Sequence, residues 1–163
     1  MDVCIVETGG TFAKVYDPIS GKLGFEDAPA QEILEISRVT TKITYQQAVQ
    51  LMDSLDMTEE DRIKILNCCR ECNQEKIVVV HGTDTMIETA KLLGSNWLPK
   101  TIIFTGAMIP YSVAGSDAVF NLGFAVACAK TLPEGVYIAM NGTIFNWDNV
   151  KKNKIQGVFE EIN

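Results

Sequence analysis

Residues 77–86, with the sequence IVVVHGTDTM, constrain the fold of this chain more than any other segment. The first half is a continuous run of apolar, mostly β-branched residues, which is typical of a strand buried on both faces in a parallel sheet. The second half places a glycine, two hydroxyls and a carboxylate at the end of that strand, and a helical pattern follows at once. In open α/β sheets, ligands bind just beyond the carboxyl ends of strands, next to the following helices. The segment therefore predicts a functional site at residues 81–85, although Thr83 or Asp84 taken alone could simply cap the helix.

Strand and helix patterns alternate along the rest of the chain. Strands are expected at residues 3–7, 77–80, 101–105, 136–140 and 143–145, with one more inside 39–52. Helices are expected at residues 30–37, 58–72, 86–93 and 116–130. Thr58 and Ser116 are the expected N-caps, and Ile63, Ile65 and Leu66 are expected to face the core. This order predicts an α/β fold with a doubly wound, mostly parallel sheet flanked by helices, as one domain over residues 1–163.

The segment between the first strand and the first helix has a different character. Residues 12–26 contain two turn signals with single apolar residues between them. We interpret the segment as a hairpin or mobile flap rather than a core element.

Charge and hydropathy exclude several classes of partner. The chain has a net charge of −7, a sequence pI near 4.7 and no long run of basic residues. Because neutralisation of phosphates supplies most of the affinity for nucleic acids and anionic membranes, neither is an expected partner. No apolar segment approaches the roughly 20 residues of a membrane span. The chain begins directly in a strand pattern without a signal peptide, so a cytoplasmic protein is expected.

Cysteine spacing does not favour a metal site. Three of the five cysteines lie close together on the expected helix 58–72, and the other two lie in apolar surroundings. A zinc site needs a fourth ligand at a suitable spacing, and the only histidine, His81, belongs to another element. We interpret the cysteines as reduced thiols, and we expect neither a metal nor a cofactor.

A second polar loop, residues 8–11, follows the first expected strand. Its two glycines allow a tight turn and the close approach of a ligand to the backbone, while its threonines present hydroxyls. The loop lacks both the GxGxxG and the GxxxxGK[ST] phosphate-binding patterns. Because it leaves a parallel strand, we expect it at the same sheet edge as residues 81–85.

A threonine at this edge needs a base, because its hydroxyl is otherwise a weak nucleophile. His81 is alone at the end of a buried strand, where a histidine is more often a packed residue than a base. A lysine made partly neutral by burial can act instead, held in position by a carboxylate. Asp84 would supply the carboxylate and Lys152 is a candidate for the lysine, although spacing alone does not single it out among 14 Lys and Arg residues.

An ordered set of motifs resembles the bacterial-type L-asparaginases. The motifs are residues 8–11, 53–57, 81–86, 104–108, 117–121, 140–142 and 150–152, and they cover nearly the whole chain in matching order. The resemblance implies the fold of the N-terminal catalytic domain of that family, a Rossmann-like three-layer sandwich. It also implies hydrolysis of L-asparagine to L-aspartate and ammonia through a threonine nucleophile and an acyl-enzyme.

The resemblance further implies roles for single residues. Thr11 matches the primary nucleophile, and Tyr16 resembles the flap tyrosine that helps to activate it. Thr83, Asp84 and Lys152 match a Thr-Asp-Lys group. The expected substrate-binding residues are Gly10, Ser54, Leu55, Asp56, Gly82, Thr83, Asp84 and Ala107. A free amino acid carries an ammonium and a carboxylate, which Asp84 and Ser54 are suited to bind, and amides of the glycine loops could hold an oxyanion.

The sequence departs from the better-known family members in one respect. Those proteins carry a second, C-terminal domain that helps to close the site of a neighbouring subunit, whereas this sequence ends soon after the lysine motif. We expect either a short asparaginase, in which a homodimer or homotetramer supplies the missing wall, or the N-terminal domain of a longer enzyme. A preference for L-glutamine or another small amide, an amidotransferase domain, and an amino-acid-binding module without turnover are the alternatives. Retention of both threonines, Asp84 and Lys152 argues against the binding module.

Overall fold

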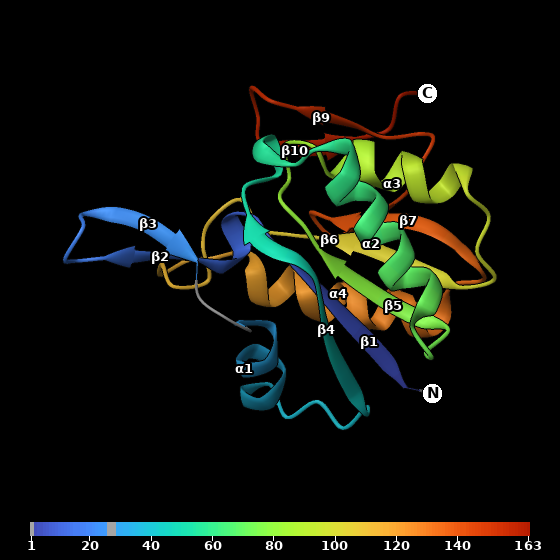
Figure 1. Ribbon diagram of the computed structural model, residues 1–163, viewed down its shortest axis with the longest axis horizontal. Helices are drawn as coiled ribbons and strands as arrows, with labels where there is room; N and C mark the ends of the chain where they lie inside the picture. Colours follow the sequence, from blue (N-terminus) through green and yellow to red (C-terminus); the bar gives the residue numbers. More distant parts are fainter. Residues whose placement is uncertain (1, 26–28) are drawn as a thin grey trace.

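The computed structural model describes residues 2–25 and 29–163. Its centre is a six-stranded sheet in the order β4-β1-β5-β6-β7-β8 (Figure 1). The strands are β1 (Val3–Gly9), β4 (Ile43–Met52), β5 (Lys76–Val80), β6 (Thr101–Thr105), β7 (Gly135–Met140) and β8 (Thr143–Asn146). All neighbours in this sheet pair in parallel except β7 and β8. The flanking helices are α1 (Pro29–Ile36), α2 (Glu59–Glu71), α3 (Met86–Ser95) and α4 (Ala118–Thr131). The predicted fold class is confirmed.

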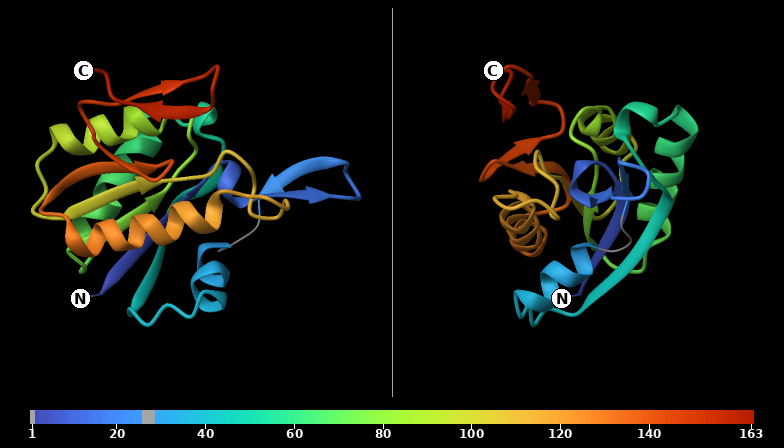
Figure 2. Two further views of the ribbon diagram at one scale, coloured as in Figure 1. Left: turned by 180° about the vertical axis from the view of Figure 1, so that it is seen from behind. Right: turned by 90° about the vertical axis from the view of Figure 1, so that its left-hand side faces the viewer.

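Each face of the sheet has its own hydrophobic core. Side chains alternate between the two faces along a strand, so Cys4 and Val6 of β1 pack on the α2 and α3 side, whereas Val3 and Ile5 pack on the α1 and α4 side. Figure 2 shows helices on both sides of the sheet. The central strands are continuous apolar runs because helices cover both of their faces.

Helix α2 begins with the predicted capping box. The backbone N–H of Asp61 donates to the Thr58 hydroxyl at 3.3 Å, and the N–H of Thr58 donates to the Asp61 carboxylate at 3.0 Å. Ile65 and Leu66 are buried as predicted, but Ile63 is exposed. That prediction was wrong because two residues turn an α-helix by roughly 200°, which places Ile63 opposite Ile65.

Helix α4 begins slightly later than predicted. Asp117, not Ser116, occupies the N-cap position. Ser116 still satisfies one free donor of the first turn, since its hydroxyl accepts from the N–H of Ala118 at 3.1 Å. The Asp117 carboxylate instead accepts hydrogen bonds from the backbone N–H groups of Met108 and Ile109.

Within the described ranges, three hairpins complete the fold. Asn141 and Gly142, with φ values of 55° and 71°, form the predicted turn between β7 and β8. The predicted hairpin in residues 12–26 consists of β2 (Lys14–Asp17) and β3 (Lys22–Phe25), and it projects away from the sheet (Figure 1). The C-terminal segment forms an antiparallel pair, β9 (Lys151–Asn153) and β10 (Val158–Glu160). Residue 26 of the predicted flap lies outside the described residues.

None of the helices in residues 2–25 and 29–163 is long and apolar enough to cross a membrane. All five cysteines are free thiols; Cys68 is half-buried and the other four are buried.

Candidate active site

The strand order places two polar loops in one crevice. The order reverses at β1, because β4 lies on one side of β1 and the later strands lie on the other side. Such a switch point opens a crevice at the carboxyl ends of the strands, where α/β proteins bind ligands. Residues 8–9 are the last two residues of β1 and residues 10–11 follow them, whereas residues 81–85 follow β5 at this point. A Cβ added to Gly10, which has a φ of +74°, would lie 2.4 Å from the Cα of Gly82. The two loops therefore meet, as the sequence predicts, and only glycine fits at Gly10.

The loop that follows β4 joins the same crevice. Ser54 is buried in the short 3-10 helix Ser54–Asp56 (η2). Its hydroxyl accepts from the N–H of Thr85 at 3.2 Å, and its carbonyl accepts from the Thr85 hydroxyl at 2.8 Å. A hydroxyl that accepts one hydrogen bond can still donate one, which leaves Ser54 able to bind a carboxylate. Leu55 and Asp56, also predicted to bind substrate, are exposed to solvent.

A lysine from the end of the chain reaches the loop after β5. The Lys152 ammonium nitrogen donates to the Thr83 hydroxyl at 2.8 Å and to Oδ1 of Asp84 at 2.7 Å, although Lys152 and Thr83 are 69 residues apart. The Lys152 side chain is only 9% exposed and that of Asp84 is 47% exposed. The structure thus brings together the three residues of the predicted Thr-Asp-Lys group.

The C-terminal hairpin holds Lys152 in this position. Lys152 pairs with Phe159 across β9 and β10. The N–H of Phe159 in turn donates to the side chain of Asn141 at 2.9 Å, which anchors the hairpin to the turn between β7 and β8.

Asp117 and Asn121 hold the loop after β6 in place by hydrogen bonds, a role that the sequence analysis did not assign to them. The backbone N–H groups of Met108 and Ile109 donate to the Asp117 carboxylate at 3.0 and 2.9 Å. Asn121 donates to the same carboxylate at 2.9 Å and to the carbonyl of Gly106 at 3.0 Å. The fixed loop brings the Met108 sulfur within 3.6 Å of the Thr83 hydroxyl. An Asp and an Asn four residues apart at the start of a helix were the sequence feature from which this role could have been predicted.

The remaining predicted residues differ in their placement. Thr11 is half-buried at the start of the 3-10 helix Thr11–Ala13 (η1), in the loop that contacts Gly82. The Ala107 side chain is buried in the core, so only its backbone can face a ligand. Tyr16 lies on the projecting hairpin and is 65% exposed. The structure therefore leaves the Tyr16 ring in solvent and does not bring it into the cluster around Lys152.

His81 is a packed residue, as the sequence reasoning favoured. Its Nδ1–H donates to the carbonyl of Gly82 at 2.8 Å, and its Nε2 accepts from the Thr89 hydroxyl at 2.8 Å. Complete burial lowers the pKa of His81 to about 4. The imidazole is neutral at pH 7 and both of its nitrogens are occupied, so it connects β5 to α3 and does not serve as a base.

Burial of His81 predicts a pH-dependent stability. Between pH 6.5 and 4 the unfolded chain protonates this histidine and the folded chain does not, so the free energy of unfolding falls as the pH is lowered through that window. The expected loss is about 3 kcal/mol, from roughly 1.4 kcal/mol per pKa unit. Urea unfolding between pH 7 and 4 measures it, with His81→Gln as the non-titrating control. Equal losses in the two proteins would contradict the assignment.

Comparisons with known proteins agree in sequence and in fold. The family model described as Asparaginase, N-terminal matches residues 2–160. An L-asparaginase of Thermococcus kodakarensis is 30% identical, with 100% of this chain aligned to 52% of that relative. A glutaminase-asparaginase of Pseudomonas fluorescens is also 30% identical, over 93% of this chain and 45% of its own length. A solved structure of the thermostable L-asparaginase from Thermococcus kodakarensis superposes with a TM-score of 0.88 at 28% identity, covering 100% of this chain and 52% of that one. The chain spans about half the length of these relatives.

Proposed function

Because the chain belongs to the asparaginase family, matching the model of its N-terminal domain over residues 2–160, we propose that it hydrolyses L-asparagine to L-aspartate and ammonia. The observation that carries this proposal is the pair of hydrogen bonds from Lys152 to Thr83 and Asp84. A lysine that is nearly buried against a threonine hydroxyl and a carboxylate is suited to proton transfer at that hydroxyl.

The proposed reaction has two steps. In the first, Thr11 Oγ1 forms a bond to the amide carbon, the carbon–nitrogen bond breaks, and the threonine proton leaves with the ammonia. Backbone N–H groups of the loops that contain Gly10 and Gly82 hold the oxyanion. In the second step, a water forms a bond to the ester carbon and the bond from that carbon to Thr11 Oγ1 breaks. One proton of the water passes through the Thr83 hydroxyl, which Lys152 holds in place, to Thr11 Oγ1, so that L-aspartate and the free threonine are released.

Two polar side chains of the crevice are suited to bind the ammonium and the carboxylate of a free amino acid. Asp84 uses Oδ1 for Lys152, which leaves Oδ2 to accept from the substrate ammonium. The Ser54 hydroxyl is available to donate to the α-carboxylate. This arrangement supports the roles that the resemblance gave to Asp84 and Ser54, whereas the exposed Leu55 and Asp56 can contribute only at the rim.

L-Glutamine is the second candidate substrate. The glutaminase-asparaginase of Pseudomonas fluorescens is as similar to this chain as the L-asparaginase of Thermococcus kodakarensis is, at 30% identity each. Asparagine and glutamine carry the same ammonium and carboxylate, so the groups proposed to bind those two ends would fit either amino acid. We keep the homodimer or homotetramer and the cytoplasmic location as parts of the proposal.

Ammonia release from this chain tests the proposed function. We expect release from L-asparagine, with L-glutamine run in parallel to rank the two amides and a sizing measurement run beside both. Calorimetric binding of L-asparagine without ammonia release would replace the enzyme with a binding module. Release from L-glutamine alone would make the chain a glutaminase.

A further inference from the structure

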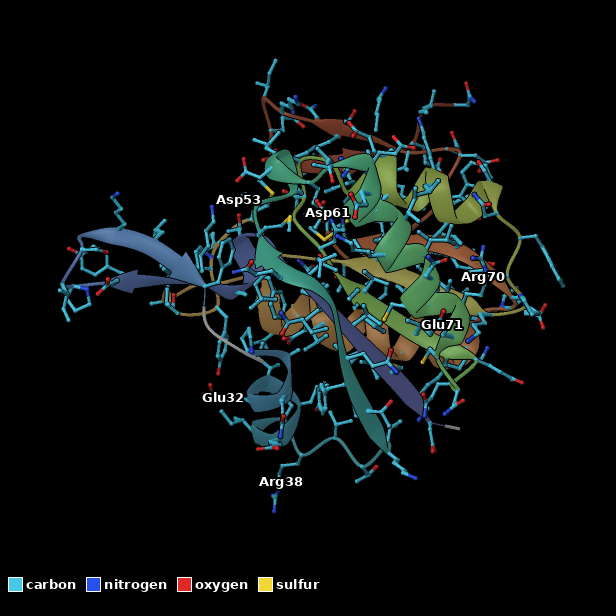
Figure 3. The ribbon with its side chains drawn as sticks, in the orientation of Figure 1. Glu32, Arg38, Asp53, Asp61, Arg70 and Glu71 are labelled. Carbon is cyan, nitrogen blue, oxygen red and sulfur yellow. The ribbon has the colours of Figure 1, made fainter. Side chains whose placement is uncertain are left out.

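An ion pair joins the projecting hairpin to the candidate site. The Lys14 ammonium nitrogen lies 2.7 Å from Oδ1 of Asp53, and the two side chains are 20% and 42% exposed. Lys14 is the first residue of β2 and directly follows η1, which begins at Thr11. Asp53 directly precedes Ser54. Figure 3 labels Asp53 on the side of the sheet from which the hairpin projects. The pair therefore links the segment of the proposed nucleophile to that of a proposed substrate-binding residue.

Two further hydrogen bonds restrain the same segment, one between backbone groups and one from a side chain. The N–H of Gly10 donates to the carbonyl of Met52 at 2.9 Å. The Ser112 hydroxyl donates to the carbonyl of Lys14 at 2.8 Å. Beyond Lys14 the hairpin projects into solvent, and Ile19 at its tip is almost fully exposed. Lys14 is thus the point at which the chain passes from a restrained segment to an exposed one.

Strand alternation relates Lys14 to Tyr16. Residues two apart on a strand have side chains on the same face, and Lys14 and Tyr16 are both in β2. Lys14 and Tyr16 therefore share one face of the hairpin, and Lys14 on that face pairs with Asp53, the residue before Ser54. We infer that Lys14 is a positioning residue, whose ion pair with Asp53 fixes Thr11 beside the loop of Ser54 and keeps the Tyr16 face turned toward the substrate.

The physical basis is the low local stability of a projecting hairpin. Segments with few buried contacts open with small free energies, so one partly shielded ion pair at the base can shift the populations of closed and open states. Lys14 would act through the placement of other groups and not by contact with the reacting atoms. The expected effect of Lys14 on turnover rests on the proposed function, whereas its restraint of the hairpin does not.

Charge reversal tests the inference. Lys14→Glu and Asp53→Lys each place like charges side by side, and we expect each to lower kcat/KM for L-asparagine by about tenfold, with changes in both kcat and KM. The double variant restores an opposite pair and is expected to return to within about threefold of the natural chain. Lys64→Glu is the matched control, because Lys64 also lies near acidic side chains, on α2, and should leave kcat/KM unchanged. Loss that the double variant does not recover would overturn the inference.

Hydrogen exchange supplies a readout that does not depend on turnover. We expect amide exchange in residues 12–17 to accelerate in both single variants and to slow again in the double variant, while exchange in β5 and β6 stays unchanged. Unaltered exchange in residues 12–17 of the single variants would refute the ion pair as a clamp. If the natural chain releases no ammonia, the proposed function fails, and these exchange rates still decide whether Lys14 holds the hairpin.

Discussion

Thr11→Ala is expected to lower ammonia release from L-asparagine by about 10,000-fold or more, because the variant lacks the proposed nucleophile. The fold should survive, since Thr11 is half-buried in a loop and is not part of either hydrophobic core. We expect the free energy of unfolding to change by less than about 1 kcal/mol, as for most changes outside the core. Steady-state ammonia release and urea unfolding on the same preparations measure the two effects.

Thr11→Ser is the matched control for this prediction. Serine keeps the hydroxyl and removes only a methyl group, so a measurable rate should remain. The role of Thr11 would be rejected if the alanine variant kept the rate of the natural chain. A loss of folding in the alanine variant would instead show that Thr11 supports the contact between Gly10 and Gly82.

The central strands could be predicted because a strand that is buried on both faces appears in the sequence as a run of consecutive apolar residues. The runs in β1, β5 and β6 are apolar at consecutive positions, and each is covered by helices on both sides. The proximity of the polar loops at the ends of β1 and β5 could also be predicted, because the carboxyl ends of parallel strands lie at the same edge of the sheet. The error at Ile63 arose where a short apolar cluster on a helix does not reveal which face is buried.

Contacts between distant loops could not be predicted in the same way. Lys152 reaches Thr83 only because β9 pairs with β10 and because Asn141 anchors that hairpin, and no local pattern encodes this combination. Family resemblance, not spacing, singled out Lys152. The pairing of Lys14 with Asp53 carried no signal, since exposed charges occur throughout the chain.

Tyr16 illustrates a different limit. Its assignment depended on matching a loop, and loops differ most in conformation and exposure between related proteins. The structure places its ring in solvent, on a hairpin face that alternation relates to Lys14. A role for Tyr16 in activating Thr11 therefore remains a prediction, and it requires the hairpin to approach the crevice when substrate binds.

Lys152→Met is expected to lower kcat for L-asparagine by about 1,000-fold, because proton transfer by a positioned side chain contributes roughly 100-fold to 10,000-fold. Methionine keeps a similar length and apolar stem, and the Asp84 carboxylate, 47% exposed, stays hydrated after it loses its partner. No charge is stranded in the core, so the fold should persist and the kinetic loss can be attributed to chemistry. Lys151→Met is the matched control, because the neighbouring Lys151 side chain is exposed and interacts with Glu160 at 3.9 Å instead. Equal rates for the two variants would show that the contact of Lys152 with Thr83 takes no part in proton transfer.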